Sequence, residues 1–141
     1  MEISRETAQT IIETAIAAGR ERKFLPLSVV VLDAGGHPKA FSREDGASPG
    51  RYKIAFGKAY GSIMLGIGGR AQMARADSQA YFVLAANGAY DGGLIPVPGG
   101  VLVRDDQGRV IGAVGVTGDT AENDVICALA GIEAVGLTAE P

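Results

Sequence analysis

Two segments of the chain have the sequence pattern of a β-hairpin, and this feature limits the fold more than any other. In each, a run rich in β-branched side chains leads into a turn containing Asp and Gly, and a second run follows at once. Strands joined by such short turns pair antiparallel, whereas parallel strands need a long crossover. The sequence therefore predicts an antiparallel sheet with strands at 27–32, 39–43, 101–104 and 110–116.

Apolar residues recur at helical spacing in the remaining segments. Ser4 suits the N-cap of the first helix, and Ser48 followed by Pro49 suits the N-cap and first turn of the second. The predicted helices cover about 4–21, 50–66, 70–87 and the segment after Asp119 or Thr120.

Residues 88–100 are predicted to form a glycine-rich loop, with room for a fifth short strand near 92–98. Residues 138–141 are expected to be loose. The order of elements is α-ββ-αα-ββ-α, which predicts one α/β (α+β) domain over residues 1–141. Helices then cover one or both faces of a four- or five-stranded sheet.

Composition and charge exclude several classes of protein. The chain has 141 residues, of which 47% are hydrophobic, enough for a single domain with its own core. A net charge of −3 without a basic cluster argues against nucleic acid as a partner. No apolar run approaches the ~20 residues that span a bilayer. The single cysteine, Cys127, permits no internal disulfide and is read as an inert, buried residue, so we predict a cytoplasmic protein.

The chain is rich in glycine and lacks familiar catalytic motifs. Glycine accounts for 21 residues, and tryptophan is absent. Glycines let backbones approach each other, or a flat ligand, closely. We find no Walker loop, His-Glu-x-x-His, Gly-x-Ser-x-Gly or paired-cysteine motif, and one histidine cannot build a multi-histidine metal centre. No catalytic residue is predicted.

Several segments together resemble one known family. They are Val-Val-Leu-Asp-Ala-Gly-Gly-His-Pro at 30–38, Ala-Phe-Ser-Arg-Glu-Asp-Gly-Ala at 40–47, Ile-Ala-Phe-Gly-Lys-Ala-Tyr at 54–60, Pro-Gly-Gly-Val at 98–101, Val-Ile-Gly-Ala-Val-Gly-Val-Thr-Gly at 110–118 and Ala-Glu-Asn-Asp-Val-Ile-Cys-Ala at 121–128. The chain resembles the GlcG/HbpS family of haem-binding proteins, which is related to the C-terminal domain of PduO-type corrinoid adenosyltransferases. The resemblance implies a profilin-like fold, a homo-oligomer and, for some members, haem or a related tetrapyrrole as ligand.

Four polar residues are candidates for holding such a ligand. His37 is the only imidazole and the candidate metal (iron) ligand, although it also fits a solvated turn. Lys58 and Arg43 could each bind a carboxylate; alternatively Lys58 extends to the surface and Arg43 forms local ion pairs. Asp45 could pair with either cation.

The other candidates are a tyrosine, a threonine and three glycines. Tyr60 could stack on a ring or simply pack in the core. Gly99, Gly100 and Gly118 could present backbone amides to an anion or a macrocycle, or could serve turn geometry alone. The Thr117 hydroxyl could face a pocket or cap the last helix.

These residues favour a binding protein over an enzyme. We expect haem, or a related small planar or carboxylated ligand, in a cleft formed by the loop at 88–100, the strand end at 115–118 and the second helix. One alternative is an enzyme or enzyme accessory acting on a small hydroxy or keto acid in a catabolic pathway. Another is a structural or regulatory subunit without a ligand.

Overall fold

A computed structural model describes residues 1–141 and contains five helices and five strands. The elements are α1 (Arg5–Glu21), β1 (Ser28–Asp33), β2 (Pro38–Arg43), α2 (Arg51–Leu65), α3 (Gly69–Ser78), α4 (Ala80–Ala89), β3 (Gly100–Arg104), β4 (Val110–Thr117), α5 (Ala121–Ala134) and β5 (Thr138–Glu140). All strands pair antiparallel, in the order β2-β1-β4-β3-β5, which confirms the predicted α+β class. None of the helices has the length and apolarity that a membrane crossing needs.

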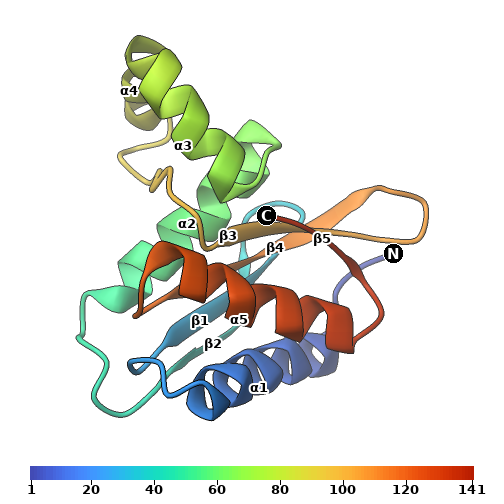
Figure 1. Ribbon diagram of the computed structural model, residues 1–141. Coiled ribbons are helices and arrows are strands. Elements are labelled where there is room, and N and C mark those ends of the chain that lie inside the picture. Colours follow the sequence, from blue (N-terminus) through green and yellow to red (C-terminus); the bar gives the residue numbers. More distant parts are fainter.

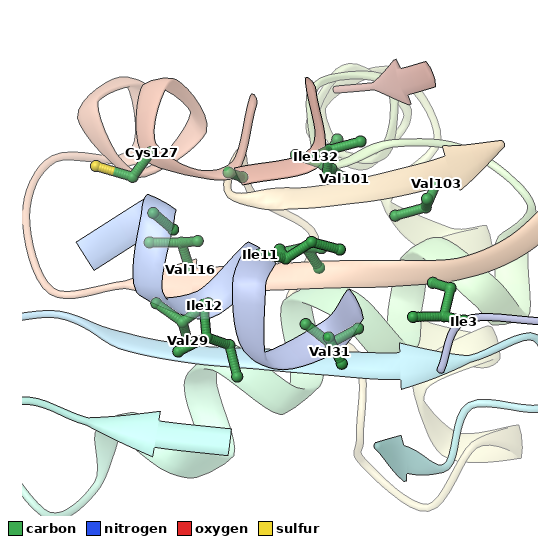
Figure 2. Packing of buried hydrophobic residues seen from close by; sticks show 14 of the residues in the cluster. Ile3, Ile11, Ile12, Val29, Val31, Val101, Val103, Val116, Cys127 and Ile132 are labelled. Atoms are coloured by element: carbon green, nitrogen blue, oxygen red, sulfur yellow. The ribbon is translucent and has the colours of Figure 1, made fainter. Parts of the chain in front are cut away.

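The helices form a layer on each face of the sheet. α1 and α5 lie side by side over one face, α2 crosses the other, and α3 and α4 project beyond the sheet (Figure 1). Strand alternation divides the apolar residues between the faces. Val29 and Val31 pack with Ile11 and Ile132 under α1 and α5, as Figure 2 shows, whereas Val30 and Leu32 pack under α2.

Glycines in β3 and β4 let α2 lie directly on the sheet. A Cβ atom added to Gly115 would overlap the carbonyl oxygen of Ala55, and one added to Gly100 would overlap that of Lys58. The small side chains of Ala55 and Ala59 complete this contact and are fully buried. The position of α2 on the sheet is therefore fixed by backbone-to-backbone packing.

The predicted starts and breaks of two helices were wrong. Ser48 does not cap α2; its carbonyl oxygen accepts from the Arg51 N–H, and Gly50 is the N-cap. Pro49 therefore occupies the second position of a turn, which proline favours as much as a first helical position. The predicted helix over 70–87 is two helices, α3 and α4, separated at Gln79, where φ is −137° and ψ is 55°.

The fifth strand lies at the end of the chain and not at 92–98, which contains no strand. Thr138–Glu140 pairs with Leu102–Arg104 and covers the outer edge of β3, so the prediction of a loose tail was also wrong. Arg104 Nε donates to Glu140 Oε2 at 2.6 Å. A three-residue strand shows too little alternation to be recognised from sequence.

The two hairpin turns have the same hydrogen bonds, as their similar sequences suggested. Asp33 Oδ1 accepts from the backbone N–H groups of Gly35 and His37, and Asp105 Oδ1 accepts from those of Gln107 and Arg109. Burial alone would raise the pKa of Asp105, but the backbone N–H and guanidinium of Arg109 and the N–H of Gln107 hold it below 3.8.

Replacing Asp105 with asparagine should therefore destabilise the protein in a pH-dependent way. Because its pKa is lower in the folded state, the carboxylate contributes stability fully above the unfolded value, and loses it as the pH falls through the folded value. The urea midpoint of Asp105→Asn should lie below that of the wild type at neutral pH. The two midpoints should converge as the pH falls below 3.8. If the two urea midpoints differ by the same amount at neutral and at acid pH, the stabilisation does not come from the Asp105 carboxylate.

Candidate ligand-binding site

A cavity of about 410 Å³ lies between the first half of α2 and the loop that follows α4. Its lining residues are Tyr52, Lys53, Ile54, Phe56, Asp91, Gly92, Gly93 and Ile95. The volume falls within the range of small-molecule sites, about 300–1,000 Å³. The cavity is open to solvent, so a ligand in it would keep part of its surface exposed.

A row of aromatic rings runs along one side of α2 and past the cavity. Tyr52, Phe56 and Tyr60 are four residues apart, which places them on one helix face. The Phe56 and Tyr60 rings stack with centroids 5.3 Å apart, and those of Tyr52 and Phe56 are 6.1 Å apart. Phe41 of β2 extends the row at one end, with its ring centroid 4.7 Å from that of Tyr52. Tyr90 extends it at the other end, with its centroid 6.3 Å from that of Tyr60. The row offers flat apolar surface to a ligand.

The loop beside the row is held in place by α2 and α4. The backbone N–H of Leu94 donates to Asn87 Oδ1 at 3.0 Å, and the N–H of Ile95 donates to the Gly57 carbonyl oxygen at 3.3 Å. Asp91 and Gly92 both have positive φ, 58° and 74°, which turns the chain sharply at the cavity. The loop is therefore shaped before any ligand arrives.

Two opposite charges stand at the cavity. Lys53 and Asp91 both line it, and they form no ion pair with each other or with another residue. Lys53 is thus free to bind a carboxylate. The arrangement suits a flat apolar ligand with an acidic group at its edge.

Lys58 lies inside the protein, away from the cavity. Its side chain is 4% exposed, and Nζ donates to Asp124 Oδ2 and to the Val116 carbonyl oxygen, each at 3.0 Å. Burial lowers the pKa of Lys58 and raises the pKa of Asp124, while the attraction between them opposes both shifts. This ion pair connects α2, on one face of the sheet, with α5, on the other face. It lies beside Val116, near the end of β4.

The sequence matches the family described as "Haem degrading protein HbpS-like" over residues 3–133. The chain belongs to the HbpS-like family. No protein with a curated description matches it.

Solved structures share the HbpS-like fold over almost the whole chain. PduOC in complex with haem has 20% identity and a TM-score of 0.88, covering 100% of both chains. A double mutant of HbpS from Streptomyces reticuli has 24% identity and a TM-score of 0.81, covering 96% of this chain and 88% of that one. Protein ORFY of Klebsiella pneumoniae has 24% identity and a TM-score of 0.83, covering 96% and 92%. At these identities the likeness shows the fold alone.

In this HbpS-like chain, the predicted glycines and Thr117 lie in close packing outside the cavity lining. A Cβ at Gly99 would lie 2.9 Å from Lys58 Nζ, and Gly100 also packs on Lys58. Gly118, with a φ of 147°, packs on the carbonyl oxygen of Pro26. Thr117 is 1% exposed and its hydroxyl accepts from Arg51 Nη1 at 3.0 Å.

The remaining predicted residues are spread over β2, the segments that flank it and α2. The side chain of His37 is 80% exposed, and Nδ1 lies 3.4 Å from Asp33 Oδ1. Arg43 and Asp45 are exposed and form no ion pair. Tyr60 belongs to the aromatic row, where it also touches the turn through Gly36. The structure does not bring Arg43 and Lys58 together at one cavity.

Sequence reasoning missed most of the cavity lining. The four-residue spacing of Tyr52, Phe56 and Tyr60 was the available signal, because it defines an aromatic helix face. Lys53 stands on that side of α2, whereas Lys58 is on the face toward the sheet. A helical projection centred on Phe56 would have favoured Lys53.

Proposed function

We propose that this HbpS-like chain binds haem, or a related flat tetrapyrrole bearing carboxylates, in the cavity between α2 and the loop at 91–95. The main observation behind this proposal is the cavity itself, which has aromatic rings on one wall, glycine backbone on another and an unpaired lysine. Membership of the family and the haem complex of PduOC support the same ligand.

The lining residues fit such a ligand. Phe56 and Tyr52 offer rings for stacking, Gly92 and Gly93 allow close approach of backbone, and Lys53 can bind a carboxylate. His37 stays the proposed iron ligand as the only imidazole, on a turn that contacts Tyr60 through Gly36. Arg43 and Asp45 are proposed contacts at the rim. Lys58, Gly99, Gly100, Thr117 and Gly118 are proposed to act indirectly, by fixing α2 against β3 and β4.

Titration with haemin tests this function. The wild type should shift the Soret band and saturate near one equivalent. Phe56→Ala removes one stacking ring and should weaken binding by about tenfold or more. Leu25→Ala removes an apolar side chain that is 63% exposed and outside the cavity, and should bind as the wild type does. His37→Ala should alter the spectrum.

Haemin binding that does not saturate would contradict the proposed site. So would a Phe56→Ala variant that binds haemin as tightly as the wild type. An unchanged His37→Ala spectrum would remove His37 as ligand. Absent binding in the wild type would favour a subunit without a ligand.

We also propose that a second copy of the chain covers α4. This ten-residue helix carries no charge and projects from the domain (Figure 1), and its Tyr81 and Leu84 are each 73% exposed. A helix that is apolar on all sides is normally buried, and interfaces between identical subunits are the more apolar kind.

Light scattering after size exclusion tests the self-association. The wild type should be oligomeric, and Leu84→Glu should be smaller because it places a charge in the apolar contact. Leu25→Glu changes a similarly exposed leucine elsewhere and should leave the mass unchanged. A monomeric wild type would contradict the interface.

The single cysteine is consistent with a reducing compartment. Cys127 is free and fully buried, and burial raises the pKa of its thiol to about 11. A thiol of this kind is inert. We therefore propose a cytoplasmic location.

A further inference from the structure

The hydroxyl of Ser28 is a buried polar group without a partner. Ser28 is 0% exposed, and its Oγ makes no hydrogen bond within the protein. Most buried hydroxyls are hydrogen-bonded, so such a group needs an explanation. Val30 and Leu32 face α2, and alternation along β1 places the Ser28 side chain on the same face.

Two arginines without acidic partners belong to the surroundings of Ser28: Arg43 is its neighbour on β2, and Arg51 contacts its neighbour on β4. Ser28 pairs across the sheet with Arg43 of β2 and with Thr117 of β4, so the three side chains stand in a row on one face. Arg51, the first residue of α2, donates from Nη1 to Thr117 Oγ1 at 3.0 Å. Neither Arg43 nor Arg51 forms an ion pair.

The N-terminus of α2 opens over the same row. Gly50 offers no capping side chain, and the N–H groups of Tyr52 and Lys53 donate to no acceptor in the protein. The first turn carries cations and no acidic residue. Cations at the positive end of a helix are unfavourable, and an anion there would reverse this.

From these observations we propose a second binding site, for a small oxyanion, formed by Ser28, Arg43, Arg51 and Thr117 at the N-terminus of α2. Arg51 is held by one hydrogen bond to a neutral hydroxyl, and it can exchange this for a charged acceptor. Both hydroxyls then donate to the anion, and the free N–H groups add to its binding. A phosphate group and a carboxylate have this chemistry in common.

Calorimetric titration with inorganic phosphate tests the site on the intact protein, with acetate as the carboxylate. Saturable binding of either is expected. Arg51→Met should weaken it by about tenfold or more, because a hydrogen bond to a charged group is lost. Arg5→Met removes an exposed cation of α1 and should have no effect. Ser28→Ala should weaken binding several-fold without lowering the urea midpoint measured free of anion, since the hydroxyl has no partner to lose.

The anion could be a carboxylate of the ligand in the cavity or a free anion, and a haemin titration of Arg51→Met distinguishes the two. Weaker haemin binding would assign the site to carboxylates of the ligand in the cavity, whereas phosphate binding with unchanged haemin affinity would assign it to a free anion. The second result stands even if haemin does not bind the wild type. The proposal is overturned if neither phosphate nor acetate binds saturably and Arg51→Met binds haemin as the wild type does. It is also overturned if Ser28→Ala loses stability but binds the anion normally.

Discussion

Replacing Lys58 with methionine is expected to lower the free energy of unfolding by roughly 3–5 kcal/mol at neutral pH. Methionine matches the length of the lysine stem, so the change removes mainly the charge and its two hydrogen bonds. Asp124 is 1% exposed and would lose its cationic partner in a dry environment. Urea unfolding followed by circular dichroism measures the effect.

The loss in Lys58→Met should depend on pH with a definite sign. Burial already raises the pKa of Asp124, and without Lys58 nothing cationic opposes it at that oxygen. Because the folded-state pKa exceeds the unfolded value, the folded state takes up the proton more readily and stability falls as the pH rises through this window. The variant should therefore recover stability toward acid pH.

A double variant controls for the uncompensated charge. Lys58→Met with Asp124→Asn removes both charges, and it should regain part of the loss at neutral pH because no ion stays buried. A loss below about 1 kcal/mol in Lys58→Met, or one that is flat with pH, would contradict a buried ion pair.

Replacing Gly115 with alanine is expected to destabilise the protein by about 2 kcal/mol or more, since overpacked positions shift their neighbours. The new methyl group would overlap the Ala55 carbonyl oxygen and lie 3.1 Å from the Ala59 side chain, so α2 would have to move off the sheet. Gly88→Ala, on α4, adds the same methyl group where nothing within the chain lies within 4 Å, and should change stability by no more than about 1 kcal/mol. Thermal and urea unfolding of both variants test this. If Gly115→Ala is as stable as Gly88→Ala, α2 and β4 are not in direct contact.

Local patterns predicted most of the fold, and long-range contacts account for what they missed. The hairpin around Asp33 and the Ser4 cap depend on neighbouring residues, and the structure confirms both. The strand at Thr138–Glu140 exists because β3 has a free edge, which the tail's own sequence does not encode. The break at Gln79 follows Asp77 and Ser78, residues with low helix propensity whose effect is too small to predict from sequence.

The site was harder to predict than the fold, because a polar residue on an apolar face can turn toward a ligand or toward a partner. The sequence predicts that Lys58 either binds a ligand carboxylate or extends to the surface, whereas the structure pairs it with a carboxylate inside the protein. Its partner, Asp124, is 66 residues away on the opposite layer and is itself a natural helix-start residue, so nothing local connects them. Tyr60 was predicted beside the site, but the cavity at Tyr52 and Phe56 depends on where the loop at 91–95 folds back.

The most direct test of the proposed cavity is amide chemical-shift mapping with gallium protoporphyrin, a diamagnetic analogue of haemin. Shifts should concentrate at residues 52–56 and 91–95, the two segments that form the cavity lining. Shifts confined to another surface hollow, such as the one lined by Ile3, Thr7 and Leu137, with residues 52–56 unaffected, would contradict it.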